Sequence, residues 1–447
     1  MAKWTYIRAV MAAMLFAGYA RVPATSAEAP PKKPVAPPIA RFALPLNGAW
    51  STRLEIPTVP ASWQSEAAAD AQLEAQPSER FFKASGAVWY WKRFSIPEGW
   101  QGKTRILRLQ FDAVAENAEV WLNGTSLGKH SGGGVPFDFN VTKSAKIGGE
   151  NLLALRVTAP IGRVGGIYRG VRLIAHDEAY VSYIWPQTDV FGHVNMEIHL
   201  LNTSTISGSA TIDVTLSPAD TPVRSLQKSN QEVLLTPGSN ISTFITSLRS
   251  RDLHLWNPDS PNVYLLKATF HQGKDLLDEL ELPVGFRTIT VDQAQWMVND
   301  KPIAITPTPP DYRLAAGTNG TDDEQKLREQ LQSLKGSGTT TLFLSAPSPE
   351  LLRLADLAGL LVVESPRQGL SSAAAHSELA ALVERDRHHP CIAAWWLKEN
   401  CSADELASLR KMDPNRVVEA GTGASTKIAL PGKRTFEPGP APAALRP

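Results

Sequence analysis

The sequence predicts a multidomain chain, in which two all-β domains of the sandwich or jelly-roll type precede a parallel (β/α) barrel region. Residues 41–178 and 179–288 contain many short alternating strands with Gly and Asn turns and no helical period, which is typical of antiparallel β domains. From residue 289 to 421, short apolar strands alternate with helices, which favours a parallel barrel. A length of 447 residues suits roughly three domains.

The composition and the charge exclude several classes of protein. With 43% apolar residues the chain can form buried cores, and a formal net charge of +1 gives no electrostatic reason to bind nucleic acid or an anionic membrane. Only Cys391 and Cys401 could form a disulfide. The strand expected between them would span roughly 20 Å, whereas bridged Cα atoms lie within about 7 Å. We therefore expect two free thiols, and no cofactor is predicted.

Residues 1–27 have the pattern of a secretory signal peptide. Basic residues flank the start, Ala9–Ala20 is an apolar run of 12 residues, and Thr25–Ala27 offers a cleavage site with small side chains. A membrane-spanning helix requires about 20 apolar residues, so we expect cleavage, no membrane span, and a secreted or periplasmic protein. An uncleaved anchor is the alternative. Residues 28–40 are rich in proline and predict an extended linker.

Three segments of the first β domain alternate apolar with polar residues, and each is expected to form a half-buried strand. They are residues 107–111, 118–122 and 153–157. Asn123-Gly124 directly follows the second segment and is a strong signal for a two-residue hairpin turn. The spacing of strands and turns therefore favours a sandwich or jelly roll.

Five motifs of this region resemble the N-terminal sugar-binding domain of family 2 glycoside hydrolases, the family of β-galactosidases, β-glucuronidases and β-mannosidases. The motifs are Trp89–Phe94, Phe111–Val114, Val120–Gly124, Pro136-Phe137 and Gly165–Arg169. Their order and spacing agree with those of the family over most of residues 41–178. The resemblance implies a jelly roll that either binds a sugar or supports the barrel.

The second β domain, residues 179–288, also shows alternating strands, for example at Val194–Leu200. Leu255–Tyr264 and Val284–Arg287 resemble the immunoglobulin-like domain of the family and its closing strand. Titratable residues do not cluster in this part of the sequence, so we expect a spacer.

The third region, residues 289–421, is expected to form part of a TIM-type barrel. Asn299–Ile305 is interpreted as a hairpin that leads into the first strand, and Thr321–Glu324 as a capping box that opens a helix ending at Gly336. Ser348 and Pro349 open a second helix, which Gly359 ends. The remaining expected strands are 339–344, 360–363, 391–397 and 417–420, and the remaining helices are 372–385 and 403–411.

The stretch from Arg385 to Asn400 combines a polar corner, a buried strand and a polar pair at the carboxyl end of that strand. In (β/α) barrels that end carries the catalytic residues. The stretch resembles the acid/base signature of family 2, with matches at Arg385, Asp386, His389, Pro390, Ile392 and Trp395. The signature ends in Asn-Glu, whereas this chain has Glu399-Asn400. Trp396 stands where the family has a small Ser, and Lys398 where it has Gly.

The exchanged pair predicts a loss of catalysis. A retaining glycosidase needs two carboxyl groups about 5–5.5 Å apart, one of them a nucleophile. Asn400 has no acidic proton to donate, and Glu399 would reach the pocket only after a one-residue slip of the strand. The family carries its nucleophilic glutamate on a later strand. With about five strands expected here and a disordered Pro-rich tail at 422–447, no intact catalytic pair is expected.

Two further positions were considered as candidate sites. Glu364 matches a carboxylate that follows the third strand of the family, which makes it a weak candidate for a lone general acid; a strand-end carboxylate without function is the alternative. His388-His389 has no third ligand nearby in the sequence, so no metal site is predicted. Gly338–Pro349 contains neither Arg nor His, although the family has both in this region.

Three functions remain compatible with the sequence. The first is a secreted, catalytically inactive relative of family 2 that binds β-linked carbohydrate or acts in assembly. The second is an active β-glycosidase, with Glu399 as acid and a nucleophile from Glu364 or from a partner chain. The third is an interaction module that does not bind sugar. Because a partial barrel leaves an open sheet edge, we also expect a homo-oligomer or a partner that covers this edge.

Overall fold

The computed structural model describes most of the chain after residue 40. The described residues are 41–47, 50–54, 72–73, 86–101, 106–115, 117–132, 135–159, 166–167, 169–292, 295–308, 321–366, 372–397, 401–420, 428–429 and 435–436. The predicted signal peptide, the predicted linker at 28–40 and Lys398–Asn400 lie outside them.

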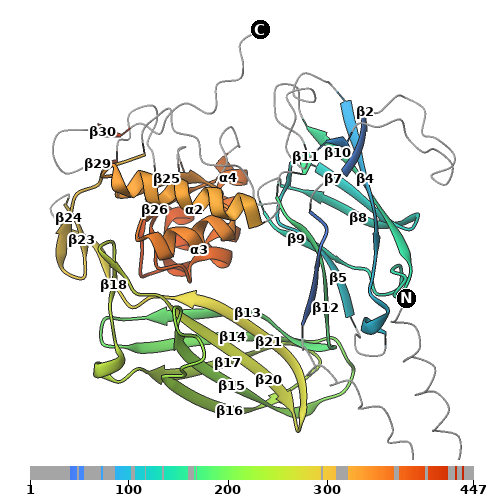
Figure 1. Cartoon of the computed structure of the whole chain (residues 1–447), viewed down its shortest axis with the longest axis horizontal. Helices are drawn as coiled ribbons and strands as arrows, with labels where there is room; N and C mark the ends of the chain where they lie inside the picture. The colour runs from blue at the N-terminus through green and yellow to red at the C-terminus, as the bar shows by residue number, and fades with distance from the viewer. Residues whose placement is uncertain are drawn as a thin grey trace, which may run out of the picture. The chain divides into compact units, whose positions relative to one another are not determined.

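The first domain is a β-sandwich of two antiparallel sheets (Figure 1). One sheet has the strand order β1-β12-β5-β9, and the other has the order β3-β2-β4-β10-β7-β8. The strands are β1 (Phe42–Pro45), β2 (Trp50–Leu54), β3 (Gln72–Leu73), β4 (Gly86–Ser95), β5 (Ile106–Phe111), β7 (Asn117–Leu122), β8 (Thr125–Ser131), β9 (Phe137–Asn140), β10 (Glu150–Ala159) and β12 (Val171–His176). A short pair, β6 (Val114–Ala115) with β11 (Gly166–Ile167), and the 3₁₀ turn η1 (Glu98–Trp100) complete it.

The alternating segments predicted from the sequence form the core of this sandwich. Leu109, Val120 and Leu153 come from the three predicted strands, and none of them has exposed surface. The predicted hairpin joins β7 to β8, with φ of 52° at Asn123 and 81° at Gly124. Both residues adopt the left-handed conformation that a two-residue hairpin requires and that Asn and Gly tolerate best. The jelly-roll prediction is confirmed.

The second domain is an immunoglobulin-like sandwich of a three-stranded and a four-stranded sheet. The strand orders are β13-β14-β17 and β16-β15-β20-β21. The strands are β13 (Ala179–Thr188), β14 (His193–Asn202), β15 (Gly208–Pro218), β16 (Gln227–Leu235), β17 (Gly238–Ser247), β20 (Tyr264–Gln272) and β21 (Asp275–Val284). The 3₁₀ turn η2 (Ser250–Asp252) and the short pair β18 (Trp256–Asn257) with β19 (Ser260–Pro261) lie in the connection to β20. Val194, Ile198 and Ile212 fill the core without exposed surface.

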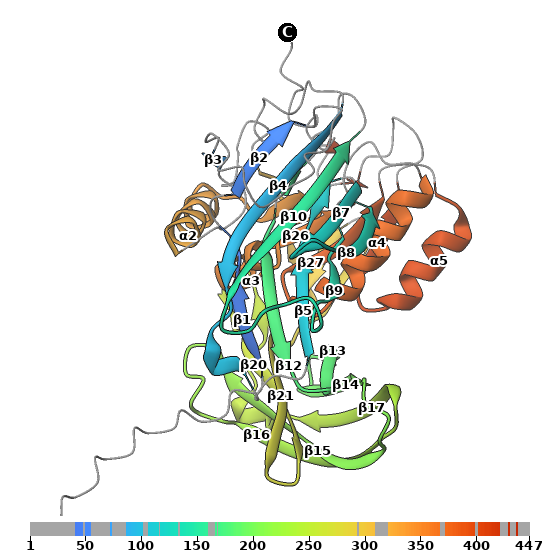
Figure 2. The ribbon, with the colours of Figure 1, turned by 90° about the vertical axis from the view of Figure 1, so that its right-hand side faces the viewer.

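The third region contains a parallel sheet with the order β25-β26-β27-β28, and all three strand pairs are parallel. Its strands are β25 (Thr341–Ser345), β26 (Leu361–Ser365), β27 (Ile392–Leu397) and β28 (Val417–Ala420), and its helices are α2 (Thr321–Gly336), α3 (Pro349–Ala358), α4 (Ser372–Asp386) and α5 (Ala403–Met412). Figure 2 shows α4 and α5 side by side. Among the described helices, none is long and apolar enough to cross a membrane.

The predicted elements of this region are confirmed, and local signals explain their ends. The Ser348 hydroxyl accepts a hydrogen bond from the Leu351 amide at 3.2 Å, with Pro349 in the first turn of α3. Gly359 ends that helix in the left-handed conformation, with φ of 67°. A Cβ atom at Gly359 would lie 2.4 Å from the Pro258 carbonyl oxygen of the second domain. The close approach of that oxygen therefore leaves no room for a side chain at this position.

The entry into the parallel sheet begins with the hairpin that was expected at Asn299–Ile305. β23 (Gln295–Val298) pairs with β24 (Lys301–Ile303) on one side and with β22 (Ile289–Asp292) on the other, in a separate antiparallel sheet. Asn299 and Asp300 form the turn between β23 and β24, and both residues have positive φ. The chain reaches the parallel sheet later, where Pro307 forms a parallel bridge to Thr341.

The carboxyl-terminal tail also contains structure where none was expected. Within 422–447, β29 (Ile428–Ala429) pairs with β30 (Thr435–Phe436) in an antiparallel hairpin, with Ile428 opposite Phe436. Such a cross-strand apolar pair favours pairing even in a Pro-rich segment. Among the strands of the described residues, β28 has one neighbour, β27. A covering partner for its other edge stays a prediction.

Candidate functional site

The carboxyl edge of the parallel sheet is the place where the sequence analysis expects the functional residues. The hydroxyl groups of Ser345 and Ser365 are 3.0 Å apart where β25 and β26 end. Leu397 ends β27 and is buried. The exchanged pair Glu399-Asn400 follows β27 but lies outside the described residues. Their roles therefore stay predictions.

Glu364 lies on β26 at this edge, and its side chain has no exposed surface. Its nearest cationic partner is the Arg385 guanidinium, whose Nη2 lies 4.0 Å from Glu364 Oε1. Neither carboxyl oxygen of Glu364 has a hydrogen-bond donor within the described part of the chain. Arg385 instead engages Asp386 through both Nε and Nη2.

Burial raises the pKa of the Glu364 carboxyl well above its usual range, and the neighbouring Asp386 carboxylate raises it further. The Arg385 guanidinium acts in the opposite direction but is shared with Asp386. Burial and Asp386 therefore both favour the uncharged form of the Glu364 carboxyl. A raised pKa suits a general acid, but this side chain has no surface through which a substrate could reach it. In the described arrangement Glu364 acts as a packed residue of the strand.

Trp396 occupies the position where the family signature has a small residue. All six residues of β27 are buried, and 5% of Trp396 is exposed. Trp395 donates its indole N–H to Asp413 at 2.9 Å, so Trp396 points to the opposite face of the strand. The indole nitrogen of Trp396 has no acceptor in the described part of the chain. The large ring thus takes up space close to the sheet edge.

The loop after β25 joins the first domain to this edge. Arg169, from the predicted Gly165–Arg169 motif, donates to the carbonyl oxygen of Pro347. Arg385 donates to the same oxygen at 2.6 Å. One motif of the sugar-binding-like domain and one of the acid/base-like stretch therefore meet on a single backbone atom. The Arg169 contact joins the first domain to the barrel region, whereas the Arg385 contact lies within the barrel region.

The polar corner before β27 is a rigid turn rather than a ligand site. His389 Nδ1 lies 2.6 Å from Asp356 Oδ2, and the Cys391 amide donates to Asp356 Oδ1 at 2.9 Å. Burial and the neighbouring His389 lower the pKa of the His388 ring well below its usual range. In the described ranges no His, Cys, Asp or Glu group could hold a metal ion. Cys391 and Cys401 are both free thiols, as predicted.

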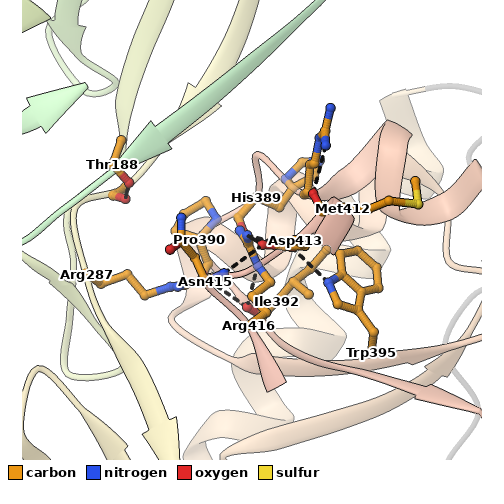
Figure 3. Close-up of polar contacts among 12 residues, drawn as sticks. Thr188, Arg287, His389, Pro390, Ile392, Trp395, Met412, Asp413, Asn415 and Arg416 are labelled. Carbon is orange, nitrogen blue, oxygen red and sulfur yellow. Dashed lines mark hydrogen bonds and ion pairs between the residues drawn. The ribbon is translucent and has the colours of Figure 1, made fainter. Parts of the chain in front are cut away.

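The amino edge of the sheet carries a hydrogen-bond network with the second domain that the sequence analysis did not identify (Figure 3). Arg287 donates to the carbonyl oxygens of Pro390 at 2.7 Å and Ile392 at 2.6 Å. Arg416 also donates to the Ile392 oxygen, at 3.1 Å, and pairs with Asp413 at 2.9 Å.

Close packing accompanies these bonds at the same edge. A Cβ atom at Gly285 would lie 2.5 Å from Pro390 Cβ, which explains the glycine of the Val284–Arg287 motif. This motif was expected only to close the second domain. Its glycine and its arginine, two residues apart, were the available signal of a contact with the barrel region.

The comparisons with known proteins agree with this architecture. Residues 49–176 match the model of the sugar binding domain of glycosyl hydrolases family 2, and residues 179–287 match a second model of glycosyl hydrolases family 2. Together the two models cover more than half of the chain. The chain belongs to glycosyl hydrolase family 2.

Individual relatives also support the assignment to family 2. A putative β-glucuronidase of Formosa agariphila is 28% identical over 382 residues, which cover 78% of this chain and 35% of that protein. A β-galactosidase of Bacteroides ovatus is 28% identical over 337 residues, which cover 69% of this chain and 39% of that protein. The chain thus spans between a third and two fifths of the length of these relatives.

Solved structures show the same fold. A family 2 β-glucuronidase superposes with a TM-score of 0.72 at 19% identity, over 87% of this chain and 47% of that one. A β-glucuronidase of Bacteroides uniformis gives a TM-score of 0.69 at 20% identity, over 85% and 52% of the two chains. The chain therefore shares the fold of these structures.

Proposed function

We propose that this protein is a secreted or periplasmic member of family 2 that has lost glycosidase catalysis and retains a role in binding β-linked carbohydrate or in assembly. The proposal rests on the side chains at the carboxyl edge of the parallel sheet, where retaining hydrolysis would need two carboxyl groups. The acid/base position is Asn400, and the described carboxyl group at this edge, Glu364, is fully buried and has a raised pKa. Neither provides the facing pair that retaining hydrolysis requires.

The role in carbohydrate binding has separate support. Residues 49–176 match a sugar-binding domain, and the relatives with the same domains are named β-glucuronidase or β-galactosidase. Those names also favour the second candidate, an active β-glycosidase in which Glu399 acts as the acid. The two candidates predict different kinetics but the same first domain.

Turnover separates the two candidates. The full chain is incubated with nitrophenyl β-galactoside, β-glucuronide and β-mannoside, next to a heat-denatured sample of the same protein. We expect no saturable release of nitrophenol above the denatured control. Saturable release from any of the three substrates would overturn the loss of catalysis and establish the second candidate.

Binding is measured separately, by calorimetry of the full chain with β-linked galacto-, glucurono- and manno-oligosaccharides. Saturable binding of one of them supports the carbohydrate role. Absence of heat with all three would leave an interaction module without affinity for sugar, which is the third function considered above.

The location of the protein is tested on native material. The signal pattern of residues 1–27 predicts that the mature chain begins near Glu28 and is recovered outside the cytoplasm. Amino-terminal sequencing of the native protein that begins at Met1 would contradict this part of the proposal.

A further inference from the structure

A cavity of about 420 Å³ lies between the second domain and the amino edge of the parallel sheet. Trp185, Asp189 and Arg287 line it from the second domain, and Arg387, Asn415 and Arg416 line it from the barrel region. It is separate from the carboxyl edge, where the family places its sugar. Its volume falls within the range of about 300–1,000 Å³ that is typical of small-molecule sites.

More positively charged than negatively charged side chains line this cavity. Three guanidinium groups line it, those of Arg287, Arg387 and Arg416, against the two carboxylates of Asp189 and Asp413. Asp413 is occupied by Arg416 and by the Trp395 indole. Asp189 is paired with His193 at 2.7 Å and is 41% exposed. The inner wall therefore combines three cations with one anion that is already bonded.

Two of the three arginines have N–H groups for which no hydrogen bond to a described residue is present. Arg287 is 6% exposed and uses two of its five N–H groups, both for backbone oxygens. Arg387 is 8% exposed and donates to the Met412 carbonyl oxygen at 2.9 Å. The Arg387 Nε–H has no acceptor among the residues that the structure describes. Buried guanidinium groups in proteins are normally saturated with acceptors, so this wall lacks anionic oxygens.

The pKa shifts of Arg287 and Arg387 agree with a shortage of acceptor oxygens in the wall of the cavity. Burial and the nearby Arg416 lower the pKa of Arg287 to about 9. Burial lowers the pKa of Arg387 as well, although Asp413, Glu384 and Glu197 oppose that effect. Glu384 and Glu197 do not belong to the lining of the cavity. An anion in the cavity would offset the repulsion between Arg287 and Arg416 and the cost of burying Arg387.

The position of Arg387 is fixed in a way that suits a binding residue. Its guanidinium carbon lies 3.6 Å from the centroid of the Trp185 ring, and both side chains line the cavity. Stacking on an aromatic face holds a guanidinium group in one plane and leaves its edge available for a bidentate contact with a carboxylate or a phosphate. The site is therefore preorganised by the contact between the two domains.

We propose that this cavity binds a small organic anion of monosaccharide size, whose carboxylate or phosphate group is held by Arg287 and Arg387. The proposal is independent of the catalytic state of the chain and of sugar binding by the first domain. Because the two arginines come from different domains, the anion also stabilises the contact between the second domain and the barrel region.

The test uses calorimetry of the full chain at low ionic strength with glucuronate, glucose 6-phosphate and glucose as probes. We expect saturable binding of glucuronate, of glucose 6-phosphate or of both, and no binding of the neutral glucose at this site. The acid that binds identifies the anionic group. Added sodium chloride should weaken the binding, because it screens the guanidinium groups.

Two variants locate the site. Arg387→Met removes the charge but keeps a long side chain against Trp185, and Asn415→Asp adds a negative charge at an exposed lining position. Each should weaken binding of the anion at least tenfold. Asn230→Asp, at an exposed position on β16 that does not line the cavity, has the same net charge as Asn415→Asp. It should bind the anion like the wild type.

Three results would overturn the proposal. They are the absence of saturable binding of either anion, binding of glucose as tight as that of the anions and sensitive to the same variants, and anion binding that both variants leave unchanged. If Arg387→Met does not fold, the exposed Asn415→Asp variant decides alone, with Asn230→Asp as its control. Unchanged affinity in Asn415→Asp then counts against the site.

Discussion

The carboxyl edge and the amino edge of the same parallel sheet hold buried charge in different ways. At the carboxyl edge, Glu364 has no hydrogen-bond donor within the described residues, and its pKa is raised. At the amino edge, Arg287 and Arg416 donate to backbone oxygens of the turn before β27 and of its first residue. The first edge encloses a buried acid that has only a long ion pair with Arg385 among the described residues, whereas the second has a hydrogen-bonded network and an open cavity.

The difference shows that Arg287 and Arg416 at the amino edge are hydrogen-bonded, whereas the buried Glu364 carboxyl at the carboxyl edge has no donor among the described residues. The residues that a glycosidase would use are replaced or buried at the carboxyl edge. The residues that join the domains form hydrogen bonds at the amino edge. Four variants test this contrast, and they are described from the largest expected effect to the smallest.

The largest effect is expected from Arg287→Met. The substitution removes the Arg287 donor to the carbonyl oxygen of Pro390 and one of the two arginine donors to the carbonyl oxygen of Ile392. Loss of buried charged hydrogen bonds should lower the free energy of unfolding by about 2–5 kcal/mol. Urea denaturation measures the change. The control Arg93→Met breaks an exposed pair with Glu150 and should cost less than about 1 kcal/mol. Equal losses in both variants would contradict the importance of the amino edge.

A smaller loss is expected from Gly285→Ala at the same edge. The added Cβ atom would lie 2.5 Å from Pro390 Cβ and 3.1 Å from Trp256 Cβ. Both neighbours belong to the packed interface, so the overlap should cost about 1–3 kcal/mol. Thermal unfolding compared with Gly99→Ala, which has open space around its Cβ position, provides the measurement. A Gly285→Ala protein as stable as the wild type would mean that the domain contact is loose.

The opposite sign is expected from Glu364→Gln at the carboxyl edge. Because the pKa of Glu364 is raised in the folded protein, the folded state binds a proton that the unfolded state has lost above the ordinary pKa of Glu. The wild type therefore loses stability as the pH rises above about 4.5, until the folded pKa is reached. Glu364→Gln does not titrate, so its stability relative to the wild type should increase as the pH rises above the ordinary pKa of Glu. A difference in the free energy of unfolding that stays constant as the pH rises, measured by urea denaturation, would contradict the raised pKa.

The smallest effect is expected from restoring the family order of the acid/base pair. In an enzyme that lacks only its acid, a restored glutamate recovers about 10²–10⁴-fold in rate. The double variant Glu399→Asn with Asn400→Glu should show no release of nitrophenol, because Glu364 is buried and cannot act as the facing carboxylate. Added azide should also give no glycosyl azide with the wild-type chain. Activity in either experiment, absent after heat denaturation, would reveal a nucleophile at the carboxyl edge.

Local patterns in the sequence were sufficient for the architecture. Alternation at 107–111 and 118–122, the Asn123-Gly124 turn and the caps at Ser348 and Gly359 each predict an element that the structure contains. These signals are reliable because they depend on residues only a few positions apart. The hairpin expected at Asn299–Ile305 is also present, but the local pattern did not indicate that β22 would pair with β23 and extend it to a three-stranded sheet.

The sequence by itself determined that this chain carries two β domains, a parallel barrel region and an acid/base position that holds Asn400. The tertiary structure alone decided that Glu364 is sealed and that Arg287, Arg387 and Arg416 converge on one cavity. The physical reason is separation along the chain: Arg287 and Arg387 are 100 positions apart, and no local period records which distant side chains meet. Burial and pairing of charge are properties of those meetings, so they follow only from the folded chain.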